Sequence, residues 1–335
     1  MGGSVGGRRR FRVLVVAVVL ILAVLGCSGG SGQTPEPKAS STQAARPPLG
    51  PARIVTTTHV SGRVWDLAVA SPAVGNTVNV RLLLPAGFKA EPKRRWPALY
   101  LLHGCCDTYQ SWTRSTDIER RTEDLDAVVV MPDGGPAGFY SDWRDGPGWE
   151  TFHLSELPDV LAGTYRTGTP RVIAGVSMGG LGALGYAARH PGMFRVAASF
   201  SGIVDTRLSP RESQAYVRLV RSQGEDPRKL WGDPVQDAQV WKDHNPLDLA
   251  PRLRGTKLFV SAGDGRPGPL DPGRAGLDEI EASLRVENDA FAARVKQLGL
   301  DAEVSLYTPG THSWAYWQRE LTRSWPLITA GLGLR

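Results

Sequence analysis

The chain has few cysteines and no long hydrophobic run. Only three of its 335 residues are cysteine, and Cys105 and Cys106 are adjacent. So low a number excludes the small secreted proteins whose folds depend on several disulfides. The longest apolar run, Val13–Leu25, is shorter than the ~20 residues that a membrane-spanning helix needs. With 41% apolar and 21% charged residues, the chain has an ordinary globular composition, which excludes a fibrous or disordered protein.

Negative charge is missing from the first part of the chain. Residues 1–26 contain four arginines and no acidic residue, and residues 27–53 carry a net charge of +2. Since the whole chain carries +6, residues 54–335 are neutral. A basic surface that attracts nucleic acid is therefore not expected on the folded part, and we predict no nucleic-acid partner.

The basic residues of this first part precede the apolar run, in the order of a secretory signal. Arg8–Arg10, the run Val13–Leu25 and the small residue Gly26 fit the three parts of such a signal. The sequence Val-Leu-Gly-Cys that ends at Cys27 also resembles a bacterial lipobox, in which the cysteine is lipidated. We predict a lipoprotein signal peptide over residues 1–26, with ordinary cleavage near Gly26 or an uncleaved anchor as alternatives.

Residues 27–53 are rich in Ser, Gly, Pro, Thr and Ala and have no apolar periodicity, which predicts a flexible tether. We expect an exported protein, held at the outer face of the cytoplasmic membrane through the lipidated Cys27. Cys105 and Cys106 are then the only other cysteines. We expect two free thiols, with a disulfide between the neighbours as the alternative.

From residue 54 onwards, short β-rich runs alternate with helical segments. Residues 99–102 and 128–131 are apolar without alternation, which is typical of strands covered on both faces. The pattern predicts an α/β fold with a mostly parallel central sheet flanked by helices, and an antiparallel edge where the first strands lack helices between them. The predicted strands are Ile54–Val60, Val64–Ala70, Val78–Leu84, Ala98–Leu102, Ala127–Met131, Val172–Ala174, Ala197–Ser201, Lys257–Ser261 and Glu303–Tyr307. The predicted helices are Thr151–Leu161, Met178–Arg189, Arg211–Ser222, Val286–Leu298 and Ser313–Leu332.

A predicted strand, a tight turn and a predicted helix meet at Ser177. The segment Gly175–Gly179 fits the pattern G-x-S-x-G of a nucleophile elbow. The turn exposes the serine hydroxyl, and glycines two positions away avoid collisions with neighbouring strands. The helix that begins at Met178 points its N-terminus at the site, which favours a developing negative charge. We interpret Ser177 as a catalytic nucleophile.

A serine nucleophile needs a base and an acid. Among six histidines, His312 alone follows the last predicted strand and precedes the last predicted helix, which is the place of the base in this fold. The acid orients the histidine and stabilises its protonated form. Asp264, directly after the strand Lys257–Ser261, and Glu281, further along, both qualify.

The end of the strand Ala98–Leu102 supplies a second feature of the site. His103-Gly104 is typical of the loop that donates a backbone N–H to the oxyanion hole. We assign the two donors to the backbones of Cys105 and Met178, and the thiol of Cys105 to no catalytic role.

Several segments in the same order resemble the esterase D-like α/β-hydrolases, and among them the secreted mycolyltransferases of the antigen eighty-five group and related actinobacterial exported carboxylesterases. The resemblance implies an α/β-hydrolase fold over residues 54–335 and no cofactor or metal. It also selects Glu281 as the acid, with Asp264 as the fallback, because Glu281, Asn288 and Phe291 keep the family's spacing. The matching stretches are Tyr100–Leu102, Val130–Pro132, Phe139–Trp143, Trp149–Phe152, Ser155–Pro158, Ser177–Met178, Trp231–Gly232 and Gly310–Trp314.

The chain departs from the mycolyltransferases at the oxyanion loop. Where they carry an aspartate and an arginine that hold the trehalose acceptor, this chain has His103 and Cys106. The family's disulfide loop is replaced by the short segment Arg144–Gly148. We predict that His103 and Trp314 contact the substrate.

The resulting prediction is an exported serine carboxylesterase that acts on a small-molecule or lipid ester through Ser177, His312 and Glu281. One alternative is a mycolyltransferase-like acyltransferase that moves the acyl group to a sugar hydroxyl. A minor alternative is a non-catalytic binding protein of the cell envelope. The sequence does not predict an oligomeric state.

Overall fold

The computed structural model describes residues 50–334. The predicted signal peptide over residues 1–26, Cys27 and almost all of the predicted tether over residues 27–53 lie outside the described residues. Within residues 50–334, no helix is both long enough and apolar enough to cross a membrane.

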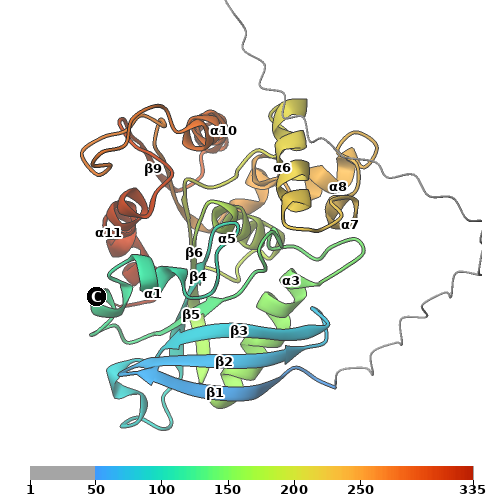
Figure 1. Cartoon of the computed structure of the whole chain (residues 1–335). Helices are drawn as coiled ribbons and strands as arrows, with labels where there is room; N and C mark the ends of the chain where they lie inside the picture. The colour runs from blue at the N-terminus through green and yellow to red at the C-terminus, as the bar shows by residue number, and fades with distance from the viewer. Residues whose placement is uncertain (1–49, 335) are drawn as a thin grey trace, which may run out of the picture. The chain divides into compact units, whose positions relative to one another are not determined.

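A nine-stranded sheet forms the centre of the described part (Figure 1). Its strand order is β1-β2-β3-β5-β4-β6-β7-β8-β9. The pairs β1–β2, β2–β3 and β3–β5 are antiparallel. The remaining pairs of the sheet, from β5–β4 to β8–β9, are parallel. The predicted α/β fold, with a mostly parallel sheet and an antiparallel N-terminal edge, is therefore confirmed. The strands are β1 (Arg53–Ser61), β2 (Val64–Ser71), β3 (Asn76–Leu83), β4 (Trp96–Leu102), β5 (Val128–Pro132), β6 (Thr167–Val176), β7 (Val196–Phe200), β8 (Lys257–Ala262) and β9 (Ala302–Leu306).

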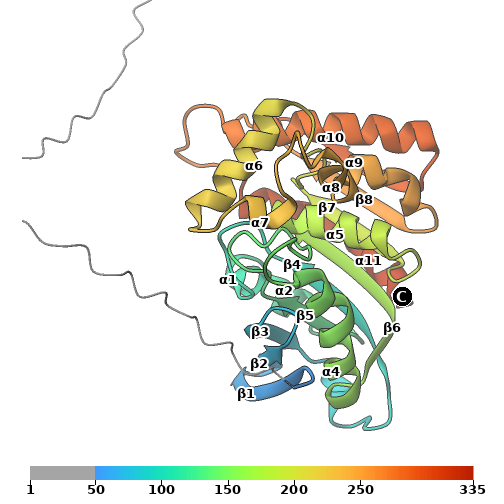
Figure 2. The same cartoon turned by 90° about the vertical axis from the view of Figure 1, so that its right-hand side faces the viewer.

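Helices cover both faces of the sheet because its central strands are apolar on both faces. In β4, Tyr100 and Leu102 belong to one buried cluster, and Leu99 and Leu101 belong to another. The first cluster includes residues of α4, α5 and α10, and the second includes residues of α1, α2 and α11. Helices α4 and α5 are seen against the sheet in Figure 2. The helices are α1 (Ser111–Ser115), α2 (Ile118–Arg121), α3 (Trp149–Thr151), α4 (Leu157–Thr164), α5 (Met178–Arg189), α6 (Pro210–Ser222), α7 (Arg228–Trp231), α8 (Ala238–Asp243), α9 (Pro246–Leu249), α10 (Glu279–Leu298) and α11 (Trp314–Gly331).

Two of the five predicted helices differ from the structure by more than one residue at an end. The predicted helix Thr151–Leu161 is part of a longer run in which a π-helical turn, Phe152–Glu156, joins α3 to α4. Helix α10 begins at Glu279 and not at the predicted Val286. Hydrophobic periodicity misses its first two turns because Ile280 is 61% exposed. Glu281, expected just before the helix, is instead buried in its first turn.

Candidate active site

The segments that carry the predicted site residues leave the sheet at the same edge. Parallel strands present their carboxyl ends together, and ligands of open α/β sheets bind there. Gly104 follows β4, Ser177 follows β6, Ser201 follows β7 and Gly263 follows β8. His312 lies in the loop between β9 and α11. Topology alone thus brings these positions to one end of the sheet.

Ser177 sits in a strained turn between β6 and α5. Its backbone angles are φ 55° and ψ −119°, in a region that residues other than glycine rarely adopt. A Cβ added at Gly175 would lie 2.1 Å from the Gly179 carbonyl oxygen, and one at Gly179 would lie 2.4 Å from that of Leu102. The two glycines of the motif are therefore required by close backbone contacts.

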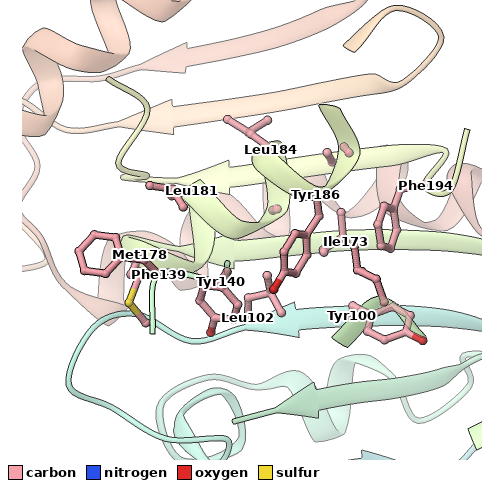
Figure 3. Packing of buried hydrophobic residues seen from close by; sticks show 14 of the residues in the cluster. Tyr100, Leu102, Phe139, Tyr140, Ile173, Met178, Leu181, Leu184, Tyr186 and Phe194 are labelled. Carbon is pink, nitrogen blue, oxygen red and sulfur yellow. The ribbon is translucent and has the colours of Figure 1, made fainter. Parts of the chain in front are cut away.

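The core beneath the elbow is densely packed and holds α5 in place. Figure 3 shows Met178, Leu181 and Leu184 of this helix among other buried hydrophobic residues. All three side chains are fully buried. Because α5 cannot shift without opening this core, the position of Ser177 at its N-terminus is fixed as well.

His312 forms a hydrogen-bonded pair with Glu281. The distance from His312 Nδ1 to Glu281 Oε2 is 2.7 Å, and the carboxylate is 0% exposed. The imidazole packs edge-on against the Trp317 ring, with the ring centroids 4.8 Å apart. A proton on Nδ1 that is donated to Glu281 leaves Nε2 free to accept another proton. This is the tautomer that a general base requires.

Two further donors hold the Glu281 carboxylate. Its Oε1 accepts hydrogen bonds from Ser201 Oγ at 2.7 Å and from the Gly263 amide at 2.5 Å. Ser201 Oγ in turn accepts from Trp317 Nε1 at 3.0 Å. Sequence analysis did not identify Ser201 as a site residue, because no motif surrounds it. Its place at the end of the predicted strand Ala197–Ser201 was the one signal that could have pointed to it.

Asp264, the alternative acid, faces other groups. Its Oδ2 accepts from Thr308 Oγ1 at 2.5 Å, and its Oδ1 accepts from the Arg266 amide at 3.0 Å. Partial burial acts to raise the pKa of Asp264, but the hydrogen bonds from Thr308 and Arg266 outweigh it and lower the pKa. No hydrogen bond between Asp264 and His312 is found in the described part of the chain.

The two predicted oxyanion donors belong to segments that line one pocket with Ser177. Met178 is the first residue of α5, so its N–H has no acceptor within the helix. Gly104 and Cys105 line the pocket, and a Cβ at Gly104 would lie 3.2 Å from the Ser177 Cβ. The neighbouring Cys106 amide is already used, because it donates to the Pro136 carbonyl at 2.8 Å.

Cys105 and Cys106 form a disulfide, so the expectation of two free thiols is wrong. Cys106 has a positive φ of 66°, and its amide is bonded to Pro136. This turn brings the two neighbouring side chains together. A sequence with two adjacent cysteines does not reveal such a turn, because the turn depends on the contact between Cys106 and the distant residue Pro136.

His103, which was predicted to contact the substrate, is buried and does not line the pocket beside Ser177. The side chain is 1% exposed, and both ring nitrogens have backbone partners. Nε2 accepts from the Gly134 amide at 2.8 Å, so Nδ1 carries the proton and donates to the Gly104 carbonyl at 2.8 Å. His103 therefore shapes the loop that precedes Cys105. Trp314, the other predicted contact, does line the pocket.

The pocket above Ser177 has a volume of about 360 Å³. Trp314 and Trp317 contact each other edge to face, with centroids 5.0 Å apart. Asp107 adds a carboxylate, which is paired with Arg114 at 2.6 Å. The pocket can accept an apolar group beside the nucleophile. Its lining residues are Gly104, Cys105, Asp107, Val176, Ser177, His312, Ser313, Trp314 and Trp317.

Helix α10 carries a second buried carboxylate, outside this pocket. Glu287 is 0% exposed and accepts from the amides of Val204 and Asp205 at 2.9 and 3.0 Å. It also accepts from the Tyr216 hydroxyl of α6. Burial raises the pKa of Glu287 to about 8, against the lowering effect of these three hydrogen bonds. Across residues 50–334, no cluster of three or more His, Cys, Asp or Glu side chains could hold a metal ion.

Comparison with known proteins identifies the family. Residues 71–328 match the family model Esterase, described as "Putative esterase". The chain is 30% identical over 341 residues to the diacylglycerol acyltransferase/mycolyltransferase Ag85B of Mycolicibacterium smegmatis, covering 97% of this chain and 96% of that one. It is 29% identical over 350 residues to Ag85A of Mycobacterium ulcerans, covering 99% and 94%.

Solved structures with the same fold agree with this assignment. MPT51 (FbpC1) of Mycobacterium tuberculosis has a TM-score of 0.66 and 24% identity, covering 79% of this chain and 97% of that one. An S-formylglutathione hydrolase from Agrobacterium tumefaciens has a TM-score of 0.64 and 19% identity, covering 84% and 100%. The predicted resemblance is confirmed: the chain belongs to this esterase family, and it shares the α/β-hydrolase fold of these solved structures.

Proposed function

We propose that this protein is an exported serine carboxylesterase whose catalytic residues are Ser177, His312 and Glu281. The observation that carries the proposal is the buried Glu281 bonded to His312 Nδ1, beside a pocket that His312 lines together with Ser177. Nucleophile, base and orienting acid are the three parts that covalent acyl transfer by serine needs. The strained backbone of Ser177 adds support, because such strain persists where function requires it.

In the acylation step, Ser177 Oγ attacks the carbonyl carbon of an ester while His312 Nε2 takes its proton. The negative charge on the carbonyl oxygen accepts hydrogen bonds from the amides of Cys105 and Met178. The intermediate collapses, the C–O bond to the alcohol breaks, and His312 returns the proton to the departing alkoxide.

In the deacylation step, water attacks the acyl-enzyme with His312 again as the base. The products are a carboxylic acid and free Ser177. Glu281 stabilises the protonated imidazole in both steps. The pocket next to Trp314 and Trp317 suits the acyl part of a small-molecule or lipid ester.

An acyltransferase is a second candidate, favoured by the full-length similarity to proteins named as acyltransferases. The same acyl-enzyme then reacts with a sugar hydroxyl in place of water. Esterase is preferred because His103, at the position of the relatives' acceptor-binding aspartate, is buried and satisfied by backbone groups.

Fluorophosphonate labelling and turnover of short-chain p-nitrophenyl esters test the proposal. The wild-type protein should show both, and Ser177→Ala should show neither. Labelling that survives Ser177→Ala would contradict the assignment, and an inactive wild type that binds ligand would favour a binding protein. Product analysis with and without trehalose then separates hydrolysis from transfer.

The location at the cell envelope is tested separately. The arginine cluster, the apolar run and the sequence Val-Leu-Gly-Cys at residues 24–27 support lipidation of Cys27. In a bacterial host, metabolic labelling with a palmitate analogue should mark the wild-type chain and spare Cys27→Ser. Equal labelling of both would contradict the lipid anchor.

A further inference from the structure

The loop between β8 and α10 ends in an aspartate that is nearly buried. Asp278 is 6% exposed and is the N-cap residue of α10. Its Oδ1 accepts from the Glu281 amide at 3.2 Å. Its Oδ2 accepts from the His312 amide at 3.0 Å. One carboxylate thus bonds the backbone of both members of the His–Glu pair.

The Asp278 backbone is itself fixed on both sides. Its amide donates to the Gly265 carbonyl at 2.7 Å, and its carbonyl accepts from the Ala282 amide at 2.9 Å. Arg274 Nη2 donates to the second carboxylate oxygen at 2.6 Å. The side chain therefore has little freedom to follow any movement of the groups that it binds.

The same loop holds the histidine segment at two more points. Gly265 donates its amide to the Gly310 carbonyl at 2.8 Å, and Thr311 Oγ1 donates to Asp271 Oδ1 at 2.5 Å. These contacts fix residues 310 and 311, whereas the contact to Asp278 fixes His312 itself. Asp278 thus connects the backbone of this segment to the helix turn that carries Glu281.

We propose that Asp278 is a positioning residue that sets the distance between His312 and Glu281. This inference rests on the proposed function of that pair. Glu281 lies three residues after Asp278 in the first turn of α10, so a cap on its amide fixes where its side chain starts. The second oxygen fixes where the His312 side chain starts. The 2.7 Å bond between them is the result.

Asp278→Ser tests the two bonds separately. Serine is as good an N-cap as aspartate, so its hydroxyl can still accept from the Glu281 amide. It has no second oxygen to reach the His312 amide. We expect kcat and the rate of fluorophosphonate labelling to fall about 10-fold or more, since the lost bond has a charged acceptor. KM and the melting temperature should change little.

Ser209→Ala is the matched control. Ser209 caps α6 in the same way, accepting from the Arg211 amide at 3.2 Å, and within residues 50–334 it makes no hydrogen bond to His312 or Glu281. Losing this cap should lower the melting temperature and leave labelling within about twofold, because caps contribute about 0.5–2 kcal/mol to stability. A purely structural role for Asp278 would make the two variants behave alike.

A magnetic-resonance readout keeps this test independent of activity. The Nδ1 proton of a histidine bonded to a buried carboxylate resonates far downfield, and Glu281→Gln identifies the signal. Asp278→Ser should shift or broaden it, whereas Ser177→Ala should not. An unchanged signal, or labelling within twofold of wild type, overturns the proposal for Asp278. Absence of labelling in the wild type instead contradicts the proposed function, and the signal still decides the role of Asp278.

Should Asp278→Ser not fold, Asp278→Asn replaces it. An amide has one acceptor oxygen, so either the Glu281 amide or the His312 amide loses its partner. The variant must then show slower labelling or a shifted Nδ1 proton signal. A variant unaffected in both respects overturns the proposal.

Discussion

Replacing Glu281 by glutamine is the sharpest test of the acid assignment. The oxygen Oε1 accepts from Ser201 Oγ and from the Gly263 amide, and both are donors in the folded protein. The amide oxygen of the glutamine therefore stays at that position. Its NH₂ group then occupies the place of Oε2 and faces His312 Nδ1. To avoid a donor-to-donor contact, His312 must carry its proton on Nε2, where it can no longer accept one from Ser177.

The expected loss is large because the histidine is held in the wrong tautomer. The corresponding acid-to-amide change in a Ser-His-Asp triad lowers kcat by about 10⁴. That factor equals about 5.4 kcal/mol of transition-state stabilisation. The fold should tolerate the change, because glutamine has the same shape and keeps the acceptor for two of the three hydrogen bonds.

The assay pairs Glu281→Gln with Asp264→Asn. We expect Glu281→Gln to lose about four orders of magnitude in p-nitrophenyl ester turnover, with circular-dichroism melting close to wild type. Asp264→Asn should stay within about threefold, because its carboxylate is bonded to Thr308 and Arg266. The assignment is refuted if Asp264→Asn has the larger effect or if Glu281→Gln loses less than tenfold.

Three more predictions concern the parts around the site. Iodoacetamide should leave Cys105 and Cys106 unmodified in the denatured, unreduced protein and modify both after reduction; modification before reduction would contradict the disulfide. Burial raises the pKa of Glu287 from 4.5 to about 8, so the folded protein keeps this carboxyl protonated at pH values where the unfolded chain has lost the proton. The stability that comes from this bound proton is lost as pH rises from about 4.5 to about 8. Urea unfolding should show Glu287→Gln gaining on the wild type through this window by at most about 1.4 kcal/mol per pH unit, and parallel curves would contradict the raised pKa. Gly179→Ala should cost about 1–3 kcal/mol in the same assay, because its Cβ meets a β4 carbonyl oxygen at 2.4 Å, and an unchanged stability would show that the elbow can relax.

The sheet and the elbow could be predicted because their signals are local. Strands covered on both faces appear as short apolar runs, and the antiparallel edge follows from the missing helices between the first strands. The turn at Ser177 needs glycine at position 175 because a Cβ there would meet Gly179 of the same turn, and at position 179 because a Cβ there would meet the neighbouring strand β4. The G-x-S-x-G pattern records both requirements in a short stretch of sequence. For the same reason the predicted bounds Met178–Arg189 of α5 are those observed.

The parts that were missed depend on contacts between distant segments. Helix α10 hides its start because Glu281 points into the protein and Ile280 points out, the reverse of the pattern that periodicity detects. Cys105 and Cys106 are joined by a turn that Pro136 stabilises from 30 residues away in the chain. Asp264 looked suitable because it follows a strand directly. Its bond to Thr308 is set by the packing of the next loop, which no local pattern encodes.

The choice between water and a sugar hydroxyl as acceptor depends on groups that the catalytic residues do not supply. His103 is committed to the Gly134 and Gly104 backbones, and Cys106 is committed to a disulfide. Neither residue offers a free charged group to a sugar. A sugar that displaces ordered water from the pocket needs such groups to replace the lost hydrogen bonds. The one carboxylate that lines the pocket, Asp107, is paired with Arg114 on the exposed side. Because these groups hold no fixed site for a sugar, we propose water as the acceptor, and product analysis with and without trehalose tests that choice.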